Sequence, residues 1–172
     1  EKPVVEYRDA LERCREAAIH TARLVDDLLF IARHQSQETR LNLTTVDLAT
    51  FVPKVLADCH GIWVDRQAAV AFNSKLGAAE IEADPDRLRQ VLMILLDNAH
   101  RYGGASIELR LTRGPDGYQV DVSDNGPGLD AEDLAHVFDR FYRGQGATQR
   151  YGAGVGLGLP VAKAIVEAHG GM

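Results

Sequence analysis

Cysteine is scarce in this chain of 172 residues, which contains only Cys14 and Cys59. The two lie far apart and outside any metal-ligand spacing, so a disulfide scaffold is disfavoured and we expect both to be packing residues in a reducing compartment. No run approaches the roughly 20 apolar residues of a membrane span. The charged start at Glu1 and Lys2 leads into no signal-peptide core. We therefore expect a soluble piece folded around its own core.

Positive charge is also in short supply, because 25 acidic residues against 19 basic ones give a formal net charge of -6. A general nucleic-acid or anionic-membrane surface is therefore disfavoured. A polyphosphate ligand would have to be met by individual arginines, backbone amides or a metal. The length and the hydrophobic content of 45% predict one domain of ordinary size plus an appended element.

Glycine is absent from residues 5–35, and Pro3 lies just before them, which predicts a single long helix. Its apolar positions have the spacing of a helical bundle or coiled-coil seam. An ordinary amphipathic helix packed on its own domain is the alternative. The seam positions repeat every seven residues and are Leu11, Ala18, Val25 and Ala32, with Cys14, Thr21 and Leu28 interleaved.

The remainder of the chain predicts a second unit of mixed helices and strands. Asp84-Pro85 is a strong helix start, since the aspartate can cap the helix and the proline suits its first position. Alternating residues on either side of residues 114–117 mark an antiparallel hairpin with one buried face. Without strict βαβ alternation, the order indicates an α+β fold. The expected elements are a connector at 34–45, a helix at 47–60 interrupted early by Pro53, strands at 70–73 and 79–83, a helix at 85–102, strands at 106–112 and 118–123, a helix at 131–138, a mobile glycine-rich loop at 144–154 and a helix at 159–169.

A first candidate segment, residues 124–128, reads Asp124-Asn125-Gly126-Pro127-Gly128 and directly follows a predicted strand. The carboxylate is held at a sheet edge beside a turn with little side-chain bulk. Glycines let the backbone approach a planar ligand, and a rigid aspartate can accept a hydrogen bond from the exocyclic amine of adenine. A plain strand-ending turn is the alternative.

A second candidate segment, residues 152–160, places glycine at every second position before a helix start. Backbone amides without side chains, together with a helix N-terminus, can form a phosphate site. No Gly-Lys-Ser/Thr follows, which excludes a P-loop, and no strand leads in, which disfavours a Rossmann fingerprint. A flexible hinge is the alternative.

A third candidate group lies on the helix at 85–102, where Asn98, Arg101 and Tyr102 are three or four residues apart and share one face. An amide oxygen suits magnesium, a guanidinium suits phosphate, and a phenol ring can cover a base. Asn98 could equally be a polar residue at a helix end. His100 points elsewhere on the helical wheel, and we expect a solvated histidine without a catalytic role.

In this order the three segments resemble the ATP-binding domain of sensor histidine kinases of two-component systems, within the ATPase fold shared with gyrase, the Hsp90 chaperones and MutL. Residues 95–102 look like the family's asparagine box, 124–128 and 154–159 like its two glycine boxes, and 138–144 like its phenylalanine box. The resemblance implies a two-layer α/β sandwich over residues 39–172 that lacks the C-terminal strands. Residues 1–38 look like the second helix of the dimerisation and phosphotransfer domain.

The resemblance further implies ATP and Mg²⁺ as ligands and a role for each matching residue. Asn98 would bind the magnesium, Arg101 would contact phosphate, and Tyr102 would cover the adenine. Arg140 or Arg143 would approach the terminal phosphate. The first glycine box would read and border the adenine, and the second would allow closure over the triphosphate: Asp124, Gly126 and Gly128 belong to the former, and Gly154, Gly156, Leu157 and Gly158 to the latter.

Two features depart from the family pattern. Ile94 stands where members usually carry a further asparagine, four residues before the metal-binding one. The phosphoacceptor box is absent, because His20 precedes Thr21 and His34 precedes Gln35. We therefore expect that this chain does not autophosphorylate in cis.

For the complete protein the resemblance implies transfer of the terminal phosphoryl group of ATP to a histidine, and then to an aspartate in the receiver domain of a response regulator. It also implies a homodimer through the bundle helix and a place in the cytoplasmic portion of a bacterial inner-membrane protein. Nucleic acid is not an expected partner. Two alternatives stay open: a degenerate dimerisation module without turnover, and an ATP-driven clamp of the chaperone or mismatch-repair type.

Overall fold

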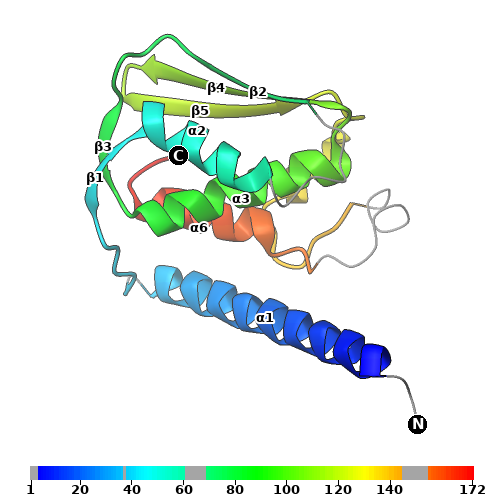
Figure 1. The fold of residues 1–172 in the computed structure, drawn as a ribbon. Helices are drawn as coiled ribbons and strands as arrows, with labels where there is room; N and C mark the ends of the chain where they lie inside the picture. The colour runs from blue at the N-terminus through cyan, green and yellow to red at the C-terminus, as the bar shows by residue number, and fades with distance from the viewer. Residues whose placement is uncertain (1–3, 37, 61–68, 145–154) are drawn as a thin grey trace. The chain divides into compact units, whose positions relative to one another are not determined.

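The computed structural model describes residues 4–36, 38–60, 69–144 and 155–172. The chain divides into two compact units, Glu1–Thr39 and Arg40–Met172. The first unit is the single helix α1 (Val4–Gln35), as the glycine-free stretch predicts (Figure 1). Its seam residues Leu11, Val25 and Leu28 are exposed, and so is Cys14, which contradicts the expectation that Cys14 is packed. Among the described residues, none of the helices combines the length and apolar character that a membrane span requires.

The second unit has α2, α3 and α6 on one side of a three-stranded sheet (Figure 1). In that sheet the order is β2-β4-β5, with β2 parallel and β5 antiparallel to β4. This is the expected two-layer α+β arrangement. The elements are β1 (Thr44–Asp47), α2 (Leu48–His60), β2 (Ala69–Ser74), β3 (Glu80–Ala83), α3 (Pro85–Tyr102), β4 (Ser106–Gly114), β5 (Gly117–Asp124), α4 (Ala131–His136) and α6 (Gly158–Ala168).

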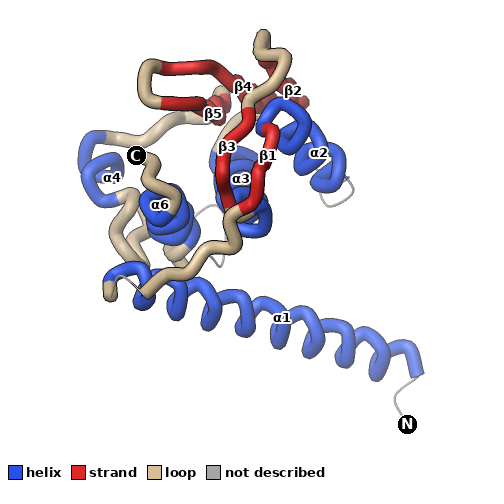
Figure 2. Tube along the Cα trace, turned by 90° about the vertical axis from the view of Figure 1, so that its left-hand side faces the viewer, coloured by secondary structure: helices blue, strands red, loops and turns tan. Residues whose placement is uncertain are grey.

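Strand β1 was not expected, since Thr44 and Thr45 were assigned to a polar connector and Asp47 to the start of the following helix. It pairs antiparallel with β3, beside which it lies in Figure 2, and its Val46 is buried. Asp47 ends the strand, and its Oδ1 accepts hydrogen bonds from the amides of Ala49 at 3.1 Å and Ala79 at 2.8 Å. These bonds fix the turn into α2, which is why that helix begins at Leu48 and not at Asp47.

Helices α2 and α4 each depart from their sequence expectation by more than a one-residue shift of an end. Pro53 lies inside α2, but the helix continues to His60, so the predicted interruption is wrong. The proline removes one backbone donor, yet the neighbouring Val52 and Val55 are completely buried and hold the helix on the core. Helix α4 ends at His136, two residues earlier than expected. Of the expected loop at 144–154, only Gly144 lies among the described residues.

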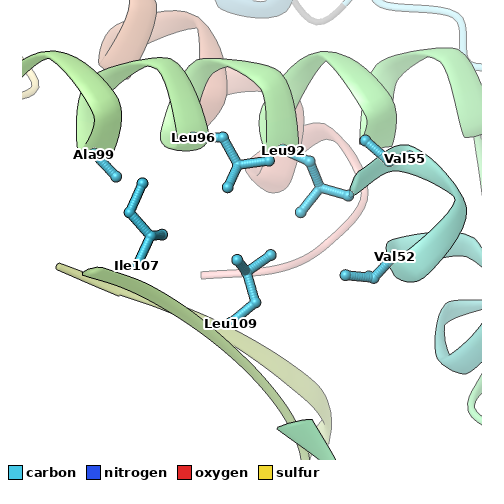
Figure 3. Close-up of a cluster of buried hydrophobic side chains, with 7 residues drawn as sticks. All are labelled: Val52, Val55, Leu92, Leu96, Ala99, Ile107 and Leu109. Atoms are coloured by element: carbon cyan, nitrogen blue, oxygen red, sulfur yellow. The ribbon is translucent and has the colours of Figure 1, made fainter. Parts of the chain in front are cut away.

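Aliphatic side chains fill the space between the helices and the larger sheet (Figure 3). Ile107 and Leu109 alternate with polar residues along β4 and point toward α3. Both are fully buried, as is Leu96 of that helix. Burying one such side chain stabilises the fold by roughly 1.5–3 kcal/mol. The core therefore fixes α3 over the sheet. Its buried members are Val52, Val55, Leu92, Leu96, Ala99, Ile107 and Leu109.

Asp84 joins three parts of the second unit. Its Oδ1 accepts the amides of Asp86 and Arg87 at the start of α3, as the sequence predicts for a capping aspartate. Its Oδ2 accepts the amide of Asn42 at 3.0 Å, and its own amide donates to Nε2 of His169, the residue that caps the end of α6. Burial alone would raise the pKa of the Asp84 carboxyl, but the amide donors outweigh it and lower the pKa below its ordinary value of 3.8.

We predict that Asp84→Ala lowers the free energy of unfolding by about 1–3 kcal/mol at pH 7, since it removes a helix cap and leaves the Asn42 amide without its acceptor. A depressed carboxyl pKa contributes stability above the unfolded value, and that contribution is lost as the pH falls through the folded value. The difference from wild type, measured by urea denaturation, should therefore shrink below about pH 4. The control is Asp86→Ala, which changes an exposed acid in the same helical turn. An equal loss in both variants would contradict the role of Asp84.

Candidate functional site

One face of α3 carries the polar candidates of the third segment. Asn98, Arg101 and Tyr102 are all half-buried near the C-terminal end of this helix. Ile94 lies one helical turn before Asn98, and Tyr102 lies one turn after it, so the three share a stripe. The guanidinium of Arg101 is held from its own helix, because its Nε lies 2.7 Å from Oδ2 of Asp97.

The end of α3 touches the turn that follows β5. A Cβ atom built on Gly126 would lie 2.6 Å from the carbonyl oxygen of Tyr102, and one built on Gly103 would lie 2.7 Å from Cβ of Asp124. Side chains cannot approach so closely, so both positions require glycine. Oδ1 of the exposed Asp124 accepts the Gly126 amide at 2.8 Å. The carboxylate is thereby fixed beside the helix end.

Asn125 fixes the same turn from its other side. Its Oδ1 accepts the amide of Ser106, the first residue of β4, at 3.0 Å. A Cβ atom on Gly104 would lie only 2.3 Å from that oxygen. Asn125 lies inside the first candidate segment but was given no role of its own, and Gly103 and Gly104 were not among the sequence candidates. Two consecutive glycines directly after Tyr102 are the signal that could have identified this contact.

The second glycine segment meets α3 at another point. Gly158 is the first residue of α6, and a Cβ atom there would lie 3.2 Å from Cγ2 of Ile94. The residue before it, Leu157, is buried, and Gly156 has a φ of 72°. Because Ile94 borders Gly158 and Tyr102 borders Gly126, Asn98 lies on α3 between the two glycine segments. Gly154 lies outside the described residues.

The candidate arginines lie just beyond α4. Arg143 is half-buried, whereas Arg140 is exposed and forms no hydrogen bond or ion pair with the rest of the described chain. Between them, Phe141 has a φ of 64°, which is unusual for a bulky residue. Its amide donates to the carbonyl oxygen of Gly156 at 2.9 Å. This bond links residues 140–143, which carry both candidate arginines and are called the arginine segment below, to the second glycine segment.

His100 does not match its sequence expectation. It is half-buried, and both ring nitrogens are shielded from solvent. Leu96, one turn earlier on the same side of α3, belongs to the buried core, so this side of the helix faces the protein. The expected solvated histidine is therefore wrong.

The C-terminal half of the chain matches a known family. Residues 83–172 match the family described as histidine kinase-, DNA gyrase B-, and HSP90-like ATPase. The matched range contains α3 and both glycine segments, the first of which is the turn after β5.

Curated relatives align with nearly the whole chain. Sensor protein IrlS of Burkholderia pseudomallei (strain K96243) is 31% identical over 168 residues, which cover 96% of this chain and 36% of the relative. Sensor histidine kinase YkoH of Bacillus subtilis (strain 168) is 33% identical over 170 residues, which cover 98% of this chain and 36% of the relative. The chain thus spans about a third of the length of these relatives.

Solved structures give the same result. Acinetobacter baumannii histidine kinase AdeS matches with a TM-score of 0.71 and 26% identity over 98% of this chain and 75% of its own. Full-length ShkA in complex with AMPPNP matches with a TM-score of 0.80 and 27% identity over 99% of this chain and 35% of its own. Both similarities include the helix-and-sheet arrangement of the second unit.

We predict that Gly103→Ala destabilises the protein by about 1–3 kcal/mol, because the new methyl group overlaps backbone and Asp124 atoms that cannot move independently. Thermal unfolding at neutral pH measures the effect. The matched control is Gly77→Ala, where a Cβ atom meets nothing within 4 Å. Equal melting temperatures for the two variants would show that the contact at Gly103 is not tight.

Proposed function

The chain belongs to the histidine kinase-, DNA gyrase B-, and HSP90-like ATPase family, and from this membership we propose that it is the ATP-binding catalytic part of a bacterial sensor histidine kinase. In this proposal residues 39–172 form the ATP-binding domain, and residues 1–38 are the second helix of a dimerisation and phosphotransfer domain. The observation that carries the proposal is the placement of Asn98 on α3 between Gly126 and Gly158. One helix face can thereby serve both ends of a single nucleotide.

The adenine would bind at the C-terminal end of α3. Asp124 is exposed, and only its Oδ1 is used by the Gly126 amide, so its second oxygen can accept a hydrogen bond from the exocyclic amine of the base. The Tyr102 ring would cover the base. Gly128 has a φ of 74°, and a Cβ atom there would meet nothing within 4 Å. The same turn therefore has open space beside its backbone.

The phosphates would lie toward the start of α6. Leu157 caps that helix without a side-chain hydrogen bond, which leaves its first amides available to an anion. Gly156 and Gly158 add little bulk there, and Arg101 supplies a cation whose position is fixed by Asp97. Together these groups could offset the charge of a triphosphate in an acidic chain.

Magnesium would depend on Asn98. Within the described residues, no group of three or more histidine, cysteine, aspartate or glutamate side chains could hold a metal ion. An amide oxygen together with phosphate oxygens is a ligand set that magnesium accepts, so Asn98 fits the ion only when nucleotide is present. When bound, the ion would neutralise charge on the phosphate oxygens.

The proposed reaction is phosphoryl transfer from ATP. The bond between the terminal phosphorus and the bridging oxygen breaks, a bond from phosphorus to a nitrogen of an incoming imidazole forms, and ADP leaves with the electron pair. The imidazole belongs to a histidine outside this chain. Arg140 or Arg143 would stabilise the charge on the transferred group, so the contribution of the chain is positioning and electrostatic.

The complete protein would pass the phosphoryl group to an aspartate of a response-regulator receiver domain. We propose that it is a homodimer through α1 and that this chain is the cytoplasmic portion of an inner-membrane sensor. The exposed apolar seam of α1 supports the homodimer. Bacterial relatives named as sensor proteins, of whose length the chain spans about a third, support its place in a larger sensor. Those names also favour a kinase over a chaperone-like or repair-type clamp, and nucleotide titration separates the kinase from a degenerate dimerisation module.

We predict that Asp124→Asn weakens ATP binding by about a hundredfold, because an amide in place of the carboxylate loses a charge-assisted hydrogen bond to the adenine amine. Isothermal titration of the chain with a nonhydrolysable ATP analogue and Mg²⁺ measures the affinity. Asp116→Asn is the control, since Asp116 is an exposed acid in the turn between β4 and β5. Unchanged affinity in Asp124→Asn would remove the adenine contact from the proposal, and no binding by wild type would favour the degenerate module.

We also predict that Val25→Glu shifts the chain toward monomer, because it places a charge in the exposed apolar seam of α1. Sedimentation velocity over a range of protein concentrations measures the shift. Arg23→Glu, which also introduces an acid but lies off the seam, should leave the distribution as in wild type. If the two variants sediment alike, α1 does not associate through this seam.

A further inference from the structure

The carboxylate of Asp133, the third residue of α4, is contacted from both sides of Arg143. The Tyr142 hydroxyl donates a hydrogen bond to Asp133 Oδ1 at 2.8 Å. A Cβ atom on Gly144 would lie 2.5 Å from Asp133 Oδ2 and 2.7 Å from its Oδ1, so the backbone there rests directly against the carboxylate. The residues before and after Arg143 are therefore both fixed by one acid.

Asp133 is itself held in place. Its amide donates to Oδ1 of Asp130, the cap of α4, at 2.7 Å. The bond that Tyr142 donates to Asp133, together with burial and the charges of Asp133, Glu132 and Asp130, raises the pKa of Tyr142 to about 12. The phenol therefore remains a hydrogen-bond donor at every pH at which the protein would be assayed.

The opposite side of the same segment is fixed by Gly156. The Phe141 amide donates to the Gly156 carbonyl oxygen at 2.9 Å. A Cβ atom on Gly156 would lie 2.7 Å from the carbonyl carbon of Phe141 and 2.7 Å from the oxygen of Tyr142. The positive φ of Phe141 is the kind of unfavourable backbone conformation that persists only where its surroundings enforce it. The segment before Arg143 is thus clamped between α4 and the residues that lead into α6.

We propose that Asp133 is a positioning residue that directs Arg143 toward the terminal phosphate of bound ATP, acting through the Tyr142 hydroxyl and the Gly144 backbone. This inference rests on the proposed function. Holding an arginine against a phosphate requires the backbone that carries it to be ordered, and the contacts on both sides of Arg143 order that backbone before the nucleotide binds. Arg140 is exposed, whereas Arg143 is half-buried and its two neighbours both contact the Asp133 carboxylate, so Arg143 is the better candidate for the terminal phosphate.

The test compares ADP with a nonhydrolysable ATP analogue, because only the analogue carries a terminal phosphate. Isothermal titration with Mg²⁺ should show that Asp133→Ala weakens the affinity for the analogue about tenfold and leaves the affinity for ADP unchanged. Tyr142→Phe removes only the hydroxyl and should shift the preference in the same direction, which keeps the test decisive if Asp133→Ala impairs folding. Glu132→Ala removes the same charge from the same turn of α4 and is the matched control.

Arg143→Ala completes a double-mutant cycle. If Asp133 acts through Arg143, adding Asp133→Ala to Arg143→Ala should cause no further change in the ratio of the two affinities. Additive changes, or equal losses for ADP and the analogue in Asp133→Ala and Tyr142→Phe, would overturn the positioning role. Failure of wild type to bind ADP would contradict the proposed function itself, whereas tight binding with an unaltered ratio in both single variants would contradict only this inference.

Discussion

The rest of the candidate site depends on a steric constraint, the close approach of the end of α3 to the turn after β5. Gly126 and Gly103 lie so near to Tyr102 and Asp124 that a methyl group at either glycine would overlap its neighbours. The contact works in both directions. It holds the Asp124 carboxylate at the edge of the sheet, and it also holds the last turn of α3 where its polar face borders that carboxylate. Any shift of the helix must therefore move the carboxylate, and the position of the site is set by the packing of α3.

That packing is fixed at the far end of the helix as well. Helix α3 has 18 residues and is about 27 Å long. Its first turn is capped by Asp84, whose amide also binds His169 at the end of α6. The two helices that border the proposed phosphates thus share a polar anchor at the ends remote from the site, and the buried cluster lies under α3 between the anchor and the site. Core and caps together behave as one rigid support.

Local chemistry predicted most elements, and a non-local contact accounts for the strand that it missed. The Asp84-Pro85 pair and the alternating residues of the hairpin act within a few residues, and both α3 and the pairing of β4 with β5 follow as expected. Strand β1 is short and exists because it pairs with a strand more than thirty residues away, as Thr45 with Glu82, which no local pattern records. The candidate site residues were predicted from motifs. Asp133, which anchors the arginine segment, could not be predicted, because in the sequence it is an ordinary acidic residue near a helix start.

The acidic character of the chain bears directly on how it could bind an anion. Asp97, Asp124 and Asp133 all lie close to proposed ligand-binding groups, and three free carboxylates there would repel a triphosphate. Of these three, Asp97 is neutralised in an ion pair with the Arg101 guanidinium, whereas Asp124 and Asp133 keep their charge and are held in place by hydrogen bonds from the Gly126 amide and the Tyr142 hydroxyl. Two of these acids hold or flank an arginine and the third lies at the proposed adenine end, so the arrangement uses negative charge to position groups that bind the nucleotide. Net charge therefore restricts the class of partner, while local pairing decides whether one anionic ligand can be accepted.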